Sequence, residues 1–245
     1  MFGQVALASV YFAAAVAGLP AYTNHAHVHG HHKRGAIDEL DRYTLYTGDG
    51  STGAGWPSQD AWATREDLWN VNVKLMKKTC GWNGWGADNS GEEIDAIESA
   101  IQELEDQTDV DGRFILAVMM QESKGCVRAP TTSNGVTNPG LMQSHNGNGT
   151  CADTNPCPAS QITQMISDGV AGTSSGDGLQ QLLDQARGVT GQNGTRPFYA
   201  AARLYNSGLI DYNNLDKAMG STACYVSDIA NRLTGWTLAG SSCRD

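Results

Sequence analysis

The sequence predicts a predominantly α-helical fold that is interrupted by one irregular or β-containing insertion. Apolar residues recur at helical spacing in several segments before and after the middle of the chain. Between these segments, residues 129–157 are rich in Gly, Asn, Thr and Pro, which do not sustain a long helix. We therefore expect a helical core with turns or a small sheet in the insertion.

The amino-terminal region has the pattern of a processed secretory leader. A short apolar run ends in small residues at positions 15–17, as a signal peptidase requires, so residues 1–17 are expected to be a signal peptide and the protein to be secreted to the outside of the cell. Residues 18–34 hold five of the six histidines and end in Lys33-Arg34, a dibasic pair typical of fungal secretion. A discarded pro-segment is the favoured interpretation, and a metal-binding tail is the alternative.

Residues 35–245 are expected to form a single, strongly acidic domain. Removal of the leader takes away two basic residues and no acidic one, so the formal net charge falls from −10 to −12. Such a chain lacks the cationic surface that attracts nucleic acid or an anionic membrane, and neither is expected as a partner. We expect a monomer without a cofactor, because no glycine-rich phosphate loop follows a predicted strand.

The first part of this domain is predicted to be an arm followed by a capped helix. Residues 35–63 show little periodicity and are expected to be extended, whereas Thr64 can cap an amphipathic helix. A Gly-rich segment, 80–86, ends that helix. Its Trp82 and Trp85 are expected to close the core, and a sugar-stacking platform is the alternative.

One carboxylic acid is placed at the end of an almost wholly apolar helix. Ser90 and Glu93 are expected to form a capping box at the start of one helix. Asp111 can cap the next helix, which is apolar, carries Glu122 near its end and is stopped by Gly125. Apolar neighbours remove hydration from a charged carboxylate, and the helix dipole disfavours negative charge at the C-terminus. Both effects raise the pKa, so Glu122 is the candidate general acid.

The carboxyl-terminal half is predicted to be helical again. Helical periodicity returns after Pro158 in four segments, at about 159–168, 178–187, 197–206 and 221–234.

Six cysteines in a secreted chain predict up to three disulfides, with fifteen possible connectivities. They are Cys80, Cys126, Cys151, Cys157, Cys224 and Cys243. Cys151 and Cys157 enclose a short loop and are expected to be a local pair. No paired metal-ligand spacing occurs, so no metal is expected. Asn148 and Asn193 begin sequons and are candidate glycosylation sites.

Four short motifs follow one another along the chain. They are Gln121-Glu122-Ser123, Gly140-Leu141-Met142-Gln143, Leu204-Tyr205-Asn206-Ser207-Gly208 and Cys224-Tyr225-Val226. Their order and spacing closely resemble those of soluble lytic transglycosylases and goose-type lysozymes, which form glycoside hydrolase family 23. The resemblance covers about residues 110–234, and it implies a lysozyme-like α+β domain with a helical core.

The resemblance also implies a role for each motif. Glu122 would protonate the glycosidic oxygen, and Tyr225 would lie close to its carboxyl group. The other substrate-binding residues that it implies are Ser123, the motif partner of the acid, Met142 and Gln143 in the sugar subsite, and Tyr205 and Asn206 in the same cleft. Taken alone, Met142, Tyr205 and Tyr225 would be ordinary core residues, and Asn206 would be a helix C-cap.

A second catalytic carboxylate is not obvious in the sequence. Where goose-type lysozymes have an Asp after the Met-Gln pair, this chain has Ser144-His145-Asn146. Lytic transglycosylases need one acid only, because the muramyl 6-hydroxyl attacks the anomeric carbon. The resemblance therefore favours an anhydro-sugar product. Asp153, an acid in the arm, or His145 are the alternatives that would activate water.

The polymer that the resemblance implies is bacterial peptidoglycan, cut at the β-1,4 bond between N-acetylmuramic acid and N-acetylglucosamine. A strongly negative chain is repelled by anionic walls, which keeps chitin and related N-acetylglucosamine polymers as the alternative substrate. A non-catalytic glycan-binding protein is the second alternative. A binding protein would have no need for the buried Glu122, because burying an ionisable acid lowers the stability of the fold.

Overall fold

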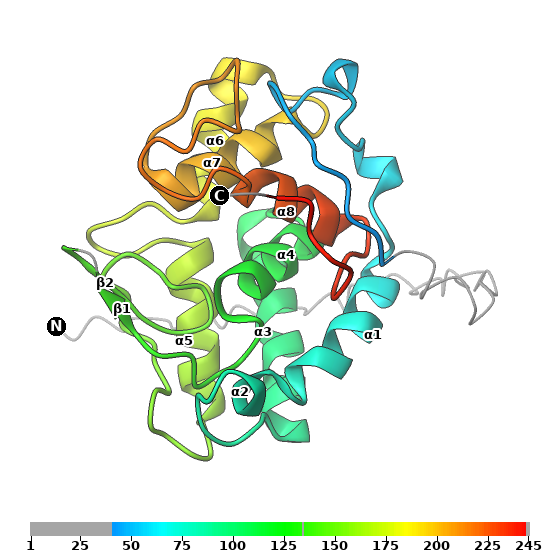
Figure 1. The fold of residues 1–245 in the computed structure, drawn as a ribbon. Coiled ribbons are helices and arrows are strands. Elements are labelled where there is room, and N and C mark those ends of the chain that lie inside the picture. Colours follow the sequence, from blue (N-terminus) through cyan, green and yellow to red (C-terminus); the bar gives the residue numbers. More distant parts are fainter. Residues whose placement is uncertain (1–40, 134, 244–245) are drawn as a thin grey trace, which may run out of the picture. The chain divides into compact units, whose positions relative to one another are not determined.

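The described chain, residues 41–133 and 135–243 of a computed structural model, is mostly helical (Figure 1). The helices are α1 (Arg65–Met76), α2 (Thr79–Trp82), α3 (Gly91–Thr108), α4 (Gly112–Ser123), α5 (Ala159–Val170), α6 (Leu179–Thr190), α7 (Arg196–Ser207) and α8 (Tyr225–Leu233). The predicted α-helical fold is confirmed for these residues. The expected signal peptide and His-rich segment lie outside the described residues.

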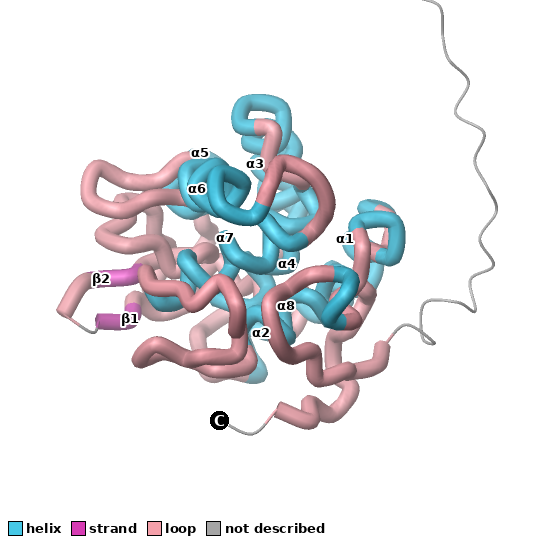
Figure 2. Tube along the Cα trace, turned by 90° about the horizontal axis from the view of Figure 1, so that it is seen from above, coloured by secondary structure: helices cyan, strands magenta, loops and turns pink. Residues whose placement is uncertain are grey.

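The insertion between α4 and α5 contains a small antiparallel sheet. Strands β1 (Thr132–Ser133) and β2 (Thr137–Asn138) pair so that Thr132 lies opposite Asn138. Figure 2 shows the pair at the rim of a lobe that is otherwise made of loops. The prediction of turns or a small sheet in this insertion is confirmed.

Helix α4 lies in the middle of the helical core. Asp111 caps it by accepting a hydrogen bond from the backbone N–H of Arg113, as predicted. Nearly every following side chain is buried, and the helix packs against α1, α3 and α8 (Figure 1). The helix ends at Ser123 because Lys124 adopts a left-handed conformation with φ of 57°. Gly125 follows with φ of 71°, and a Cβ there would lie 2.6 Å from Met76 Cγ.

Helix α3 begins with the predicted capping box, and Glu93 of this box also forms a buried ion pair. Glu93 accepts the backbone N–H of Ser90, and it also pairs with Arg128 at 2.5 Å, both side chains being 3% exposed. Burial alone would raise the pKa of Glu93. Arg128 and the backbone N–H groups of Cys157 and Ser90 outweigh that effect and hold it below its usual value. One carboxylate thus joins α3, the segment after α4 and the insertion.

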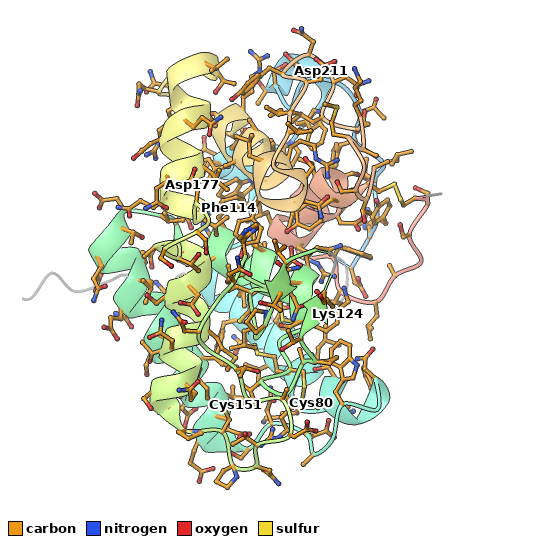
Figure 3. All side chains as sticks on the ribbon, turned by 90° about the vertical axis from the view of Figure 1, so that its left-hand side faces the viewer. Cys80, Phe114, Lys124, Cys151, Asp177 and Asp211 are labelled. Carbon is orange, nitrogen blue, oxygen red and sulfur yellow. A yellow bond between two sulfur atoms is a disulfide. The ribbon has the colours of Figure 1, made fainter. Side chains whose placement is uncertain are left out.

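Three disulfides connect the cysteines. They are Cys80–Cys126, Cys151–Cys157 and Cys224–Cys243. The expected local pair is confirmed. The first two bonds lie in the same loop-rich lobe, where Figure 3 labels Cys80 and Cys151.

The prediction that Trp82 and Trp85 close the core is wrong. Trp82 is 60% exposed and Trp85 is half-buried. The side chain of this segment that enters the core is Cys80, which is fully buried through its bond to Cys126.

Residues 41–63 form the predicted extended arm, with two short 3-10 turns at Thr52–Ala54 and Gln59–Ala61. The arm lies along α8. The Tyr43 hydroxyl donates to Asp228 at 2.7 Å, and the backbone N–H of Thr44 donates to Asn231 at 2.7 Å.

The arm also supplies the tryptophans that close the core. Trp56 and Trp62 are 2% and 5% exposed. Trp62 donates its indole N–H to the Tyr199 hydroxyl at 3.0 Å, and Trp56 packs on the same ring with centroids 5.0 Å apart.

Helices α5, α6 and α7 occupy the predicted segments, but α8 begins at Tyr225, four residues later than predicted. The cause is Arg203, a fully buried residue of α7. Its guanidinium donates to the Thr222 carbonyl and the Ser221 hydroxyl, which holds this segment as a loop. Among the described residues, no helix has the length and apolarity needed to cross a membrane.

Replacing Glu93 with Gln should lower the free energy of unfolding by about 3–5 kcal/mol, because Arg128 would remain buried without a counter-charge. The stabilisation should be fully present at neutral pH and lost as the pH falls through the depressed pKa of Glu93. Denaturant unfolding measures both effects. Asp184→Asn is the control, since its carboxylate is 68% exposed, and it should cost less than about 0.5 kcal/mol. Equal losses in the two variants would contradict the prediction.

Candidate active site

Glu122 is the penultimate residue of α4, and the residue as a whole is half-buried. Burial raises the pKa of Glu122 to about 7, although the Tyr225 hydrogen bond and the Lys124 charge each lower it. The carboxyl group is therefore close to half protonated at neutral pH. This confirms the physical expectation for an acid at the end of an apolar helix.

Tyr225, the first residue of α8, faces the acid. Its hydroxyl donates to Glu122 Oε1 at 2.5 Å, across 103 residues of sequence. The ring is 3% exposed. Burial and the neighbouring Glu122 raise the pKa of Tyr225 well above its usual value, so the phenol keeps its proton and remains a donor. The packing of α8 on α4 creates this contact.

Tyr205 on α7 connects the acid with the insertion. Its hydroxyl donates to the backbone carbonyl of Met142 at 2.8 Å. Burial raises the pKa of Tyr205, and the charge of Glu122 raises it further. The side chain of Met142 is fully buried against α5, where a Cβ on Gly169 would lie 2.4 Å from Met142 Cβ. The backbone carbonyl of Met142 thus takes part in the site, whereas its side chain packs in the core next to Gly169 of α5.

Gln143 has a left-handed conformation, with φ of 47°, and its amide spans the insertion. Its Nε2 donates to the carbonyls of Pro130 and Gly140, and its Oε1 accepts from Thr132. Ser123 is fully buried, donates to the Met119 carbonyl and accepts the backbone N–H of Gly125. Ser123 therefore closes the end of α4 and offers no surface to a ligand.

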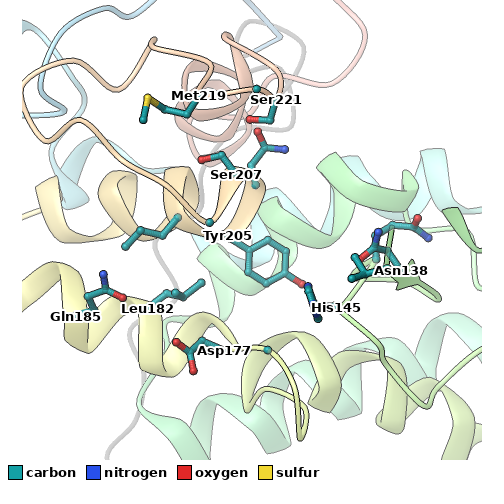
Figure 4. A pocket seen from close by; sticks show the side chains of 16 residues that line it. Asn138, His145, Asp177, Leu182, Gln185, Tyr205, Ser207, Met219 and Ser221 are labelled. Atoms are coloured by element: carbon teal, nitrogen blue, oxygen red, sulfur yellow. The ribbon is translucent and has the colours of Figure 1, made fainter. Parts of the chain in front are cut away.

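A cleft of about 560 Å³ lies beside these residues, between the insertion, α6 and the end of α7. Gln143, Tyr205 and Asn206 line it, as the sequence predicts. Figure 4 shows the Tyr205 ring in the middle, with His145 on one side and Leu182 on the other. The side chains of Glu122, Ser123, Met142 and Tyr225 are not part of its lining. The structure thus forms two groups, a Glu122–Tyr225 pair and a cleft, and Tyr205 of the cleft lies close enough to Glu122 to feel its charge.

Asn206 has a fixed orientation at the cleft wall. Its Oδ1 accepts a hydrogen bond from the buried Arg203 guanidinium, which has only donors. The Asn206 amino group is therefore the end that is left for a ligand.

A polar cluster next to the acid was not identified from the sequence. The side chain of Gln121 accepts from Arg232 at 2.8 Å and donates to Asp228 at 3.0 Å, and Lys124 donates to the Gln121 carbonyl at 2.9 Å. Burial lowers the pKa of Lys124 to about 8, and Arg232 lowers it too, whereas Glu122 and Asp228 act in the opposite direction. The available signal was the three- and four-residue spacing of Tyr225, Asp228 and Arg232 on one helix face.

The candidates for a second catalytic group are separated by the fold. Asp228, which the sequence did not single out as a candidate, accepts hydrogen bonds from Tyr43 and Gln121. His145 lines the cleft with Tyr205, whereas Asp153 lines a different cavity. Among the described residues, no three His, Cys, Asp or Glu side chains are close enough together to hold a metal ion. The sequon residues Asn148 and Asn193 are both exposed.

Comparison of the chain with known protein families, with curated proteins and with solved structures gave no match in any of the three. The motifs and the geometry described above therefore carry the functional argument.

Replacing Tyr225 with Phe should raise the pKa of Glu122 above about 7, because the lost hydrogen bond stabilises the ionised carboxylate. Carbon-13 NMR titration of the Glu122 carboxyl carbon measures the midpoint. Tyr43→Phe is the matched control, since Tyr43 donates to Asp228 and not to Glu122. An unchanged or lower midpoint in the Tyr225 variant would show that the phenol does not stabilise the carboxylate.

Proposed function

We propose that the protein is a secreted glycosidase of the lytic transglycosylase or lysozyme-like muramidase class, which cleaves β-1,4 bonds between N-acetylmuramic acid and N-acetylglucosamine in peptidoglycan. One observation carries the proposal. The half-buried Glu122 has its pKa raised to about 7 and accepts a hydrogen bond from Tyr225. A carboxyl group that holds a proton at neutral pH is what the protonation of a glycosidic oxygen requires.

Glu122 acts first as an acid and then as a base. Its proton passes to the glycosidic oxygen as the bond from that oxygen to the anomeric carbon breaks. The Tyr225 hydroxyl and the Lys124 charge then stabilise the carboxylate that is left. In transglycosylation the muramyl 6-hydroxyl bonds to the anomeric carbon and gives its proton to Glu122, which restores the acid.

The surroundings of Glu122 favour transglycosylation over hydrolysis. The carboxylate of the neighbouring polar cluster, Asp228, already accepts hydrogen bonds from Tyr43 and Gln121. A hydrolase normally places a second carboxylate within about 5–9.5 Å of the first. Hydrolysis is the alternative here, with water activated by His145 of the cleft.

The charge of the cleft keeps a neutral polymer as the alternative substrate. Asp177 lines the cleft, and no Lys or Arg of the described chain does. A cleft without a cation offers no partner for the lactyl and peptide carboxylates of peptidoglycan. Cleavage of chitin or a related N-acetylglucosamine polymer is therefore the second candidate, and a non-catalytic glycan-binding protein is the third.

Replacing Glu122 with Gln should reduce the cleavage rate by at least about 100-fold, because the amide has no proton to transfer. Wild-type activity should fall above pH 7, by about tenfold per pH unit, as Glu122 loses its proton. Turnover of peptidoglycan and of N-acetylglucosamine oligomers measures both. Glu103→Gln makes the same change at an exposed position on α3 and should leave the rate unchanged. Wild-type turnover by the Glu122 variant would refute the mechanism, and no turnover of either polymer by the wild type would favour a binding protein.

Digestion of peptidoglycan in ¹⁸O-labelled water should give 1,6-anhydromuramyl ends without the label, because the attacking hydroxyl comes from the sugar. Mass spectrometry of the products measures this. Reducing ends that carry one ¹⁸O would instead identify hydrolysis and a water-activating group such as His145.

A further inference from the structure

A second cavity, of about 760 Å³, lies in the disulfide-bonded lobe and takes no part in the proposed chemistry. We call it the Trp85 cavity. Its walls come from residues 79–89, which include α2 and which we call the tryptophan loop, from residues 128–131 and from the loop enclosed by Cys151 and Cys157. Its volume is in the range of small-molecule and sugar sites.

The tryptophan loop is firmly tied to the chain that follows Glu122. Cys80 is bonded to Cys126, and the Thr79 hydroxyl donates to the Lys124 carbonyl at 3.0 Å. At the other end of the loop, Asn89 donates to the Gly125 carbonyl at 2.7 Å. The aromatic wall of the cavity is therefore held in place before any ligand arrives, which lowers the entropic cost of binding.

The two tryptophans of this loop differ in position. Trp85 is half-buried and lines the cavity, and its backbone N–H donates to the Cys80 carbonyl at 2.8 Å. Trp82 is 60% exposed and does not line the cavity. Trp85 thus contributes an indole ring to the cavity from a backbone that is held in place, and such a ring is suited to stacking on the apolar face of a sugar.

The lining of the cavity also contains polar groups. Arg128 is 4% exposed and donates to Asn155 Oδ1 at 2.6 Å. Because a guanidinium has only donors, the Asn155 oxygen must face Arg128, and its amino group is left for the cavity. The exposed Asp153 on the same loop supplies an acceptor. An aromatic ring, an amide donor and a carboxylate acceptor match the ring face, acetamido carbonyl and hydroxyls of an N-acetylhexosamine.

The Trp85 cavity and the cleft are linked by one short segment. Pro130 and Thr131 line the cavity, while the Pro130 carbonyl and the Thr132 hydroxyl bond to Gln143 of the cleft. In Figure 3, Lys124 lies between Asp177 of the cleft and the cysteines Cys80 and Cys151. Figure 1 agrees, with α2 and α6 at opposite ends and α4 between them.

We propose that the Trp85 cavity is a distal subsite that binds N-acetylhexosamine units of the same β-1,4-linked chain whose scissile bond lies at Glu122. The inference rests on the proposed function. It assigns Trp85 as the stacking residue, Asn155 as a donor and Asp153 as an acceptor.

Binding should be measured by calorimetry in a Glu122→Gln background, so that turnover does not consume the ligand. The probes are an N-acetylglucosamine hexamer and solubilised peptidoglycan chains. Adding Trp85→Ala should weaken binding of at least one probe about tenfold, whereas Trp82→Ala should change it less than about twofold. Asn155→Asp keeps the oxygen that accepts from Arg128 and removes the amino group that would donate to the ligand, so it should also weaken binding. This variant tests the subsite if the Trp85 variant does not fold.

Unchanged binding of both probes in the Trp85 and Asn155 variants would overturn the subsite, as would an equal loss in the Trp82 control. Turnover by the wild-type chain is measured separately. Trp85-dependent binding without turnover would leave the subsite standing and refute the glycosidase. Turnover by the wild-type chain together with binding that does not depend on Trp85 would support the glycosidase and overturn the subsite.

Discussion

The contact between Tyr225 and Glu122 is the interaction on which the candidate site depends. Helix α4 is apolar over almost its whole length, so its packing in the core carries the Glu122 carboxyl into surroundings that disfavour charge. Tyr225 opposes that effect by donating a hydrogen bond, and so does the charge of Lys124. The balance places the pKa of Glu122 at about 7, where the group can release a proton and take it back.

Local signals in the sequence predicted the helices well because capping and periodicity act over a few residues. Ser90 with Glu93, and Asp111, cap helices where predicted. Long-range contacts caused the failures. The start of α8 is set by Arg203, which lies on another helix and holds the preceding segment as a loop. Near Trp82, the side chain that enters the core is Cys80, and its disulfide partner lies 46 residues away.

The candidate site was predictable only in part, because the sequence names its residues but long-range contacts set the direction of their side chains. The motif resemblance, which no match to a known protein supports, named residues that the structure places in two neighbouring groups. Glu122 meets Tyr225, and Gln143, Tyr205 and Asn206 line one cleft. Motif membership does not tell which way a side chain points. Ser123 and Met142 are fully buried and act through their hydrogen bonds and backbone, and the charged groups around Gln121 come together only when α8 packs on α4.

The amino-terminal arm has a consequence for the order in which the protein is made. Tyr43 bonds to Asp228 across 185 residues, on the helix that also carries Tyr225. The arm and α4 are synthesised long before α8. In the growing chain, Glu122 therefore lacks its hydrogen bond from Tyr225, and Tyr43 of the arm lacks its partner Asp228. Such long-range closure is slow and comes late in folding. The acid is therefore completed only when α8 has been made and has packed on α4, and a chain that stops short of Tyr225 has no hydrogen bond to tune Glu122.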